Sequence, residues 1–159
     1  ELLETFPDAC FNIDIKADAA TRPLARAIAR HAAQDRVCVG SFSTRRLQEF
    51  RRLAGTRVAT SVDPLGVVWY AYGVLGRRLL VPAGQVLQVP VRDEGTGIPI
   101  VKRDFLDAAH RAGRVVHVWT INDTSEMHRL IDLGVDGLVS DDIVALKSVL
   151  AERGLWAGS

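Results

Sequence analysis

The sequence predicts an α/β fold with parallel strands, an incomplete TIM (β/α)8 barrel of about six strand–helix units. Three observations lead to this prediction. Short β-like runs alternate with amphipathic helical stretches along the 159 residues, which is typical of parallel strands joined by helical crossovers. No G-x-G-x-x-G turn follows an early strand, and Gly95 and Gly97 later in the chain are not followed by the third glycine. A nucleotide-binding open sheet therefore loses its main support. The chain starts at Glu1 with a helical-looking segment that runs into Pro7, so we expect the first two units of the barrel to be missing.

The elements follow one another in a nearly regular order, and each is assigned from the spacing of its apolar residues. We expect strands at about 10–16, 36–41, 56–61, 85–89, 115–121 and 136–141. We expect helices at about 21–34, 43–54, 101–112, 123–133 and 143–153, with an irregular or helical insert across about 64–78. Gly113 and Gly134 stand where a glycine closes a helix, and Thr44, Asp123 and Asp141 are candidate caps or first-turn residues. These elements are expected to form a single domain over 1–159.

The composition is that of an ordinary globular domain. Apolar residues make up 48% of the chain, and 20 Lys and Arg against 19 Asp and Glu leave a net charge of +1. Proteins that bind duplexes carry a basic excess on one face, so nucleic acid is not an expected partner. No apolar run approaches the ~20 residues of a membrane-spanning helix and no signal peptide opens the chain, so we expect a cytoplasmic location, with any upstream signal outside this sequence. Cys10 and Cys38 are interpreted as small buried thiols rather than metal ligands.

The first strand carries the strongest candidate site. Successive side chains of a strand point to opposite faces, so Asn12, Asp14 and Lys16 share one face while the apolar residues between them share the other. A carboxylate therefore lies beside an ammonium group at the carboxyl end of the strand. Catalytic residues of parallel α/β folds gather at that end, so this pair predicts a functional site.

Several segments carry a family resemblance. They are Asn-Ile-Asp-Ile-Lys at 12–16, Gly-Ser-Phe-Ser at 40–43, Val-His-Val-Trp-Thr-Ile-Asn at 116–122 and Leu-Gly-Val-Asp-Gly-Leu-Val-Ser-Asp at 133–141. In this order and spacing, the chain resembles the C-terminal three-quarters of the glycerophosphodiester phosphodiesterase family. The resemblance implies a (β/α)8 barrel that hydrolyses glycerophosphodiesters to an alcohol and glycerol 3-phosphate with a divalent cation, Mg²⁺ or Ca²⁺.

The resemblance also implies roles for three residues. The corresponding strand of the family usually reads Ile-Glu-Ile-Lys, with the acid on the metal and the lysine on the phosphate. Carried over, Asp14 is the metal ligand and Lys16 contacts the phosphate as the catalytic and substrate-binding cation. Aspartate is one methylene shorter than glutamate but offers the same oxygen ligands to a hard cation. Trp119 matches a pocket tryptophan that packs on the glycerol or the head group.

The general acid and base of the family have no counterpart here. The family uses a histidine in a His-Arg-Gly motif, a second histidine in the next segment, and a Glu-x-Asp pair that completes the metal site. The four histidines of this chain stand elsewhere, at His31, His110, His117 and His128. We therefore expect little hydrolysis by the chain alone. A barrel without its first strands exposes two sheet edges, so we also expect a homo-oligomer that pairs these edges.

Each candidate residue has a simpler structural alternative. Asp14 and Lys16 could form a buried ion pair without function, and Trp119 could be a core residue. His117 is interpreted as a hydrogen-bonded interior histidine, and Asp141 either caps the last helix or borders the site. Two serines at 41 and 43 are interpreted as strand-end or N-cap residues.

Two other classes of function remain open at this point. A sugar-processing or aldolase-type barrel would also place an acid and a lysine at strand ends. In the aldolase Lys16 would be a Schiff-base nucleophile, although such a lysine would not have a metal-binding carboxylate two residues away. A non-catalytic barrel remnant would act as a binding or oligomerising scaffold. The upstream reading frame discriminates the scaffold from the enzyme, because only the enzyme needs the missing histidines and acids.

Overall fold

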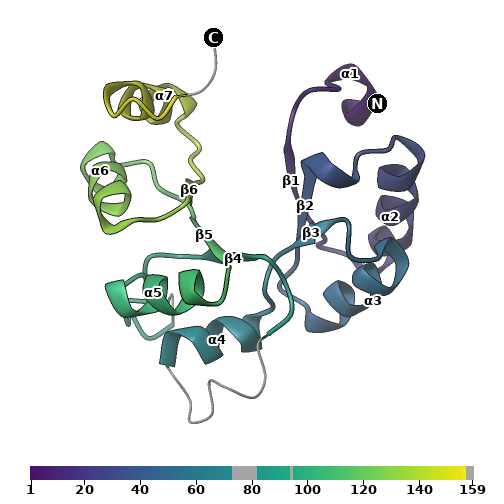
Figure 1. Ribbon diagram of the computed structural model, residues 1–159, viewed down its shortest axis with the longest axis horizontal. Coiled ribbons are helices and arrows are strands. Elements are labelled where there is room, and N and C mark those ends of the chain that lie inside the picture. Colours follow the sequence, from purple (N-terminus) through teal and green to yellow (C-terminus); the bar gives the residue numbers. More distant parts are fainter. Residues whose placement is uncertain (73–81, 94, 157–159) are drawn as a thin grey trace. The chain divides into compact units, whose positions relative to one another are not determined.

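The computed structural model describes residues 1–72, 82–93 and 95–156 (Figure 1). It divides into two compact units, Glu1–Val86 and Leu87–Ser159, and each is described by itself. The expected single domain over 1–159 stays a prediction. Part of the insert expected at about 64–78 lies outside the described residues.

The first unit holds three strands and the helices that connect them. Its elements in chain order are α1 (Leu2–Thr5), β1 (Phe11–Asp14), the short 3-10 helix η1 (Asp18–Ala20), α2 (Thr21–Arg30), η2 (Gln34–Arg36), β2 (Val37–Gly40), α3 (Thr44–Ala54), β3 (Ala59–Thr60) and α4 (Pro64–Tyr72). The strands form a parallel sheet in the order β1-β2-β3, so β1 is an edge strand of this sheet. Phe11 lies opposite Val37, and Asp14 lies opposite Gly40.

The core of the first unit lies between this sheet and its helices. Helices α2 and α3 pack against each other and lie along one side of the sheet (Figure 1). Residues from both helices, from β2 and from the position just after β1 share one apolar cluster, which consists of Ile15, Ala25, Ile28, Ala33, Val37, Val39, Phe50 and Val58. Burial of these side chains holds the carboxyl ends of β1 and β2 at defined positions.

The second unit repeats the same alternation. Its elements are β4 (Val86–Val89), which starts at the last residue of the first unit, then α5 (Arg103–Arg111), β5 (Val115–Val118), α6 (Thr124–Leu133), β6 (Gly137–Leu138) and α7 (Ile143–Glu152). The sheet order is β4-β5-β6, and β5 and β6 pair in parallel with His117 opposite Gly137. Helix α6 packs against α7, and α5 packs against β5. Within the described ranges, no helix combines the length and the apolar character needed to cross a bilayer.

The observed elements are shorter than the predicted ones at several ends. The strand expected at 115–121 ends at Val118, which lies opposite Leu138, the last residue of its parallel partner β6. The helix expected at 21–34 ends at Arg30, because the chain turns through a positive φ of 48° at Ala32. Gly134 closes α6 in the left-handed conformation at φ 99°, as the sequence predicts.

The predicted caps are partly confirmed. Asp123 caps α6, since its side chain accepts a hydrogen bond from the backbone N–H of Glu126. Asp142 rather than Asp141 caps α7, so the capping alternative for Asp141 is wrong. Ser43 caps α3 and Thr44 is the first helical residue, which confirms the N-cap interpretation of Ser43.

Candidate functional site

Strand β1 brings Asp14 and Lys16 to its carboxyl end. The Ile15 side chain between them is only 2% exposed, whereas the Asp14 and Lys16 side chains are both exposed, which confirms the predicted alternation of faces. The Ile15 N–H donates to the carbonyl of Gly40 at 2.8 Å, so the ladder with β2 extends one residue beyond Asp14. The alternative of a buried ion pair finds no support within the described part of the chain, because both side chains are exposed and no ion pair joins them there.

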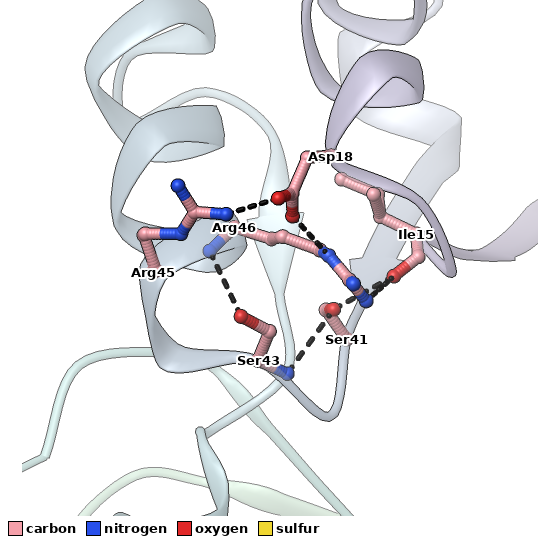
Figure 2. A network of polar contacts seen from close by, with 6 residues as sticks. All are labelled: Ile15, Asp18, Ser41, Ser43, Arg45 and Arg46. Atoms are coloured by element: carbon pink, nitrogen blue, oxygen red, sulfur yellow. Dashed lines mark hydrogen bonds and ion pairs between the residues drawn. The ribbon is translucent and has the colours of Figure 1, made fainter.

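A polar network holds this strand end in place (Figure 2). The Ile15 carbonyl accepts a hydrogen bond from Ser41 Oγ at 2.8 Å and another from Arg46 Nη1 at 3.3 Å. Ser41 Oγ also accepts from the Ser43 N–H at 3.2 Å, so one buried hydroxyl links the ends of β1 and β2 to the start of α3. The strand-end interpretation of Ser41 is confirmed by these contacts.

Asp18 continues the network two residues after Lys16. Its carboxylate accepts from Arg46 Nε at 2.7 Å and also pairs with Arg45 (Figure 2). The hydrogen bond from Arg46, together with the positive charges of both arginines, holds the pKa of Asp18 below its ordinary value despite some desolvation. The carboxylate therefore stays ionised over the physiological range. The sequence analysis missed Asp18 and Arg46, although an acid shortly after a strand end is a visible signal for such a contact.

Trp119 follows β5 in the second unit. Its backbone N–H donates to the carbonyl of Val89 at 3.1 Å, which places it beside the end of β4. The side chain is half-buried, whereas Val116 and Val118 on the other face of β5 are completely buried. A partly exposed indole at a strand end is suited to pack on a bound molecule, and a purely internal role would bury it further. Its predicted role in the pocket stays a prediction.

His117 shares the half-buried face of β5. Its ring lies against β6, since a Cβ added at Gly137 would come within 2.6 Å of His117 Cδ2. Burial lowers the pKa of His117, and the nearby Asp136 carboxylate raises it by a smaller amount. The ring makes no hydrogen bond with the described residues, so this part of the sequence interpretation finds no support there.

The end of β6 carries a second polar arrangement, which the sequence analysis also missed. Asn122 Oδ1 accepts a hydrogen bond from Ser140 Oγ and another from the Asp141 N–H, both at 3.0 Å. A single amide oxygen therefore ties the segment after β5 to the segment after β6. Asp141 is exposed beside this contact, and the alternative that it borders the site stays a prediction.

The other three histidines pair with carboxylates outside the candidate site. His31, just after α2, pairs with Glu4 at 3.6 Å; His110 in α5 pairs with Asp136 at 2.8 Å; His128 in α6 pairs with Glu152 at 3.6 Å. None of these pairs includes Asp14 or Lys16. The expectation that the four histidines do not supply the general acid and base of the site stays a prediction.

A divalent cation would find one suitable ligand at the end of β1. Among the described residues, no group of three or more His, Cys, Asp or Glu side chains could hold a metal ion. At the end of β1 Asp14 offers exposed carboxylate oxygens, the donor type that hard cations take, whereas the nearby Asp18 carboxylate is engaged by Arg45 and Arg46. Mg²⁺ is commonly held by one or two carboxylates together with water and substrate phosphates, so a single carboxylate fits it as a partial site.

The comparison with known proteins decides the family. The model of the glycerophosphoryl diester phosphodiesterase family matches residues 3–145. The chain belongs to this family. The "Probable glycerophosphodiester phosphodiesterase 2" of Mycobacterium tuberculosis is a phosphodiesterase relative that is 37% identical over 164 residues, a match that takes in 100% of this chain and 61% of the relative.

Solved phosphodiesterase structures share the fold. The glycerophosphodiester phosphodiesterase of Thermotoga maritima is 21% identical with a TM-score of 0.60, over 98% of this chain and 63% of that one. The glycerophosphodiester phosphodiesterase of Parabacteroides distasonis is 20% identical with a TM-score of 0.63, over 91% of this chain and 58% of that one. The predicted fold class, an incomplete TIM barrel with parallel strands, is confirmed. The chain spans about three-fifths of the length of these phosphodiesterases.

Proposed function

We propose that the protein containing this chain hydrolyses glycerophosphodiesters to an alcohol and glycerol 3-phosphate. The observation that carries the proposal is the exposed Asp14 and Lys16 pair at the carboxyl end of β1, in a chain that belongs to the phosphodiesterase family. The name of the Mycobacterium tuberculosis relative supports the same activity. An aldolase-type role for Lys16 is disfavoured, because a Schiff-base lysine is activated in a desolvated pocket, whereas the Lys16 side chain is exposed.

The two side chains would share the negative charge of the phosphodiester. The Lys16 ammonium would contact a non-bridging phosphate oxygen and neutralise charge that grows in the transition state. The Asp14 carboxylate would hold a divalent cation, Mg²⁺ or Ca²⁺. When bound, such a cation acts as a Lewis acid on the phosphoryl oxygens. Trp119 would pack its half-buried ring against the glycerol or the head group.

Charge neutralisation is only part of the chemistry. Hydrolysis also needs an activated water and a protonated leaving group. His31, His110 and His128 are engaged with carboxylates away from Asp14, and His117 packs on β6. We therefore propose that the 159-residue chain by itself has little hydrolytic activity.

The test is the release of glycerol 3-phosphate from glycerophosphocholine, with Mg²⁺, with Ca²⁺ and with a chelator. It would compare the 159-residue chain with the protein encoded by the full reading frame that contains it. Asp14→Asn and Lys16→Met should each lower kcat/KM at least about 100-fold, because each removes charge stabilisation specific to the transition state. Asp35→Asn is the matched control, since Asp35 is an exposed acid of the same unit in a surface pair with Arg57. Equal activity of Asp14→Asn and Asp35→Asn would contradict the proposed role of Asp14.

A scaffold function is the second candidate, and the edge position of β1 in the first sheet favours it. Strand β1 is an edge of the sheet β1-β2-β3, and an unprotected edge invites pairing with another chain. We propose that the isolated chain forms a homo-oligomer through this edge, which light scattering coupled to size exclusion would detect. A monomer at all concentrations would contradict it. The cytoplasmic location also stays a prediction, which fractionation of cells producing the full reading-frame protein would test.

A further inference from the structure

We propose that Arg46 is a positioning residue for Lys16, because its guanidinium bonds to the chain immediately before and shortly after that lysine. The inference rests on the proposed function, since Lys16 needs a defined position only if it contacts a substrate. Arg46 itself lies in the first turn of α3 and is not proposed to touch the phosphate.

The first contact is on the N-terminal side of Lys16. Arg46 Nη1 donates to the Ile15 carbonyl, which belongs to the peptide group that joins Ile15 to Lys16. The same carbonyl accepts from Ser41 Oγ at 2.8 Å, and the Ile15 N–H is bonded to β2. Since the Ile15 side chain is also in the core, the backbone leading into Lys16 has little freedom left.

The second contact is on the C-terminal side of Lys16. Arg46 Nε donates to Asp18 Oδ1 at 2.7 Å, so one planar group holds positions 15 and 18 at once (Figure 2). Between these two anchored positions lie only Lys16 and one alanine. The backbone between residues 15 and 18 is therefore held at both of its ends, which fixes the point at which the Lys16 side chain leaves the backbone.

Arginine suits this task better than lysine does. The guanidinium presents several N–H donors in a rigid planar fork, whereas an ammonium is a point charge on a flexible stem. The Arg46 side chain is 25% exposed, and it reaches both acceptors from inside the network. Arg45 differs, because its side chain is 74% exposed and its contact in the network is with Asp18.

The position of a charged group matters strongly for catalysis. A substitution far from the reacting atoms that displaces a catalytic group by about 1 Å can lower the rate on the order of 100-fold. Lys16 has a long flexible side chain, so a fixed backbone at residues 15–18 is the contribution that the scaffold can make. The loss of Arg46 should therefore lower activity through Lys16 rather than through global unfolding.

The test is a double-mutant cycle in the protein encoded by the full reading frame. Arg46→Gln, Lys16→Met and the double variant would be compared by kcat and KM for glycerophosphocholine. Arg57→Gln is the matched control, because it removes an exposed arginine–aspartate pair elsewhere in the same unit. Hydrogen exchange of the peptide covering 15–20 and the unfolding midpoint would be measured for each protein.

We expect Arg46→Gln to lower kcat/KM about 10- to 100-fold, and Arg46→Lys to recover only part of the loss. The cost of Lys16→Met should be about 10-fold smaller in the Arg46→Gln background than in the wild type, because the lysine is then already misplaced. The amides of 15–20 should exchange faster in Arg46→Gln than in Arg57→Gln.

The outcomes separate the two proposals. If the wild type releases no glycerol 3-phosphate, the proposed function fails, and the positioning role fails with it. If the wild type is active and Arg46→Gln behaves like Arg57→Gln in rate and in exchange, the positioning role alone is overturned. Additive costs of Arg46→Gln and Lys16→Met would also overturn it, since they would mean that Arg46 acts independently of the lysine.

Discussion

Gly84→Ala tests the close backbone contact between Gly84, just before β4, and Ser61 and Val62, just after β3. Gly84 has a φ of 115°, and a Cβ added there would lie 2.6 Å from the Ser61 carbonyl oxygen and 2.7 Å from the Val62 nitrogen. These are backbone atoms held by other bonds: the Val62 N–H donates to the carbonyl of Val86 at 2.8 Å, and Arg51 Nη2 donates to the Ser61 carbonyl at 2.7 Å. The added methyl group cannot be accommodated by the rotation of a side chain.

The expected magnitude has two parts. An alanine forced into a conformation that favours glycine costs about 1–3 kcal/mol. Extra volume in a closely packed place costs about 1–3 kcal/mol more. We therefore expect Gly84→Ala to lower the free energy of unfolding by about 2–6 kcal/mol.

Gly55→Ala is the matched control. Gly55 also has a positive φ, at 73°, but nothing lies within 4 Å of an added Cβ. This variant should lose only the conformational part, about 1–3 kcal/mol. Urea unfolding followed by circular dichroism would measure both, and with a slope of about 2 kcal/mol per molar urea the two midpoints should differ by about 1 M. Equal midpoints would refute the reasoning, because they would mean that the close approach of residue 84 to residue 61 costs nothing.

Three further predictions concern single side chains. Burial lowers the pKa of His117 below its ordinary value of 6.5, so the unfolded chain binds the proton more readily than the folded chain does. The stability that this group contributes is therefore present above about pH 6.5 and is lost as the pH falls. The melting temperature of the wild type should fall from pH 7.5 to pH 5.5, and this fall should be smaller in His117→Gln. An equal fall in the two proteins would refute this. Asp123→Ala should cost about 1 kcal/mol in urea unfolding through its lost N-cap, whereas Asp141→Ala should stay within about 0.5 kcal/mol. Phe50→Ala, at a completely buried position, should lower the free energy of unfolding by about 3–5 kcal/mol, whereas truncation of the 44% exposed Leu53 in the same helix should cost much less.

The features of the candidate site that depend on neighbouring residues were predictable from the sequence. Alternation along β1 is a property of neighbouring residues, so the sequence placed Asp14 and Lys16 on one face and Ile15 on the other, and the structure shows the first face exposed and Ile15 in the core. The resemblance then supplied their expected roles. The contacts that hold Lys16 were not predictable in the same way, because Asp18 and Arg46 are 28 residues apart and meet only after β1 and β2 have paired.

The sequence by itself determined the order of strands and helices, the faces of β1 and several helix ends. These features depend on residues within a few positions of each other, such as the Asp123 cap and the left-handed Gly134. Only the tertiary structure decided that β5 ends before Trp119, since its last residue, Val118, lies opposite the last residue of β6. It also decided that Asn122 ties the segment after β5 to Ser140, a pairing of residues 18 positions apart. The physical reason is that periodicity and capping are local interactions, whereas strand length and side-chain networks depend on which distant segments the fold brings together.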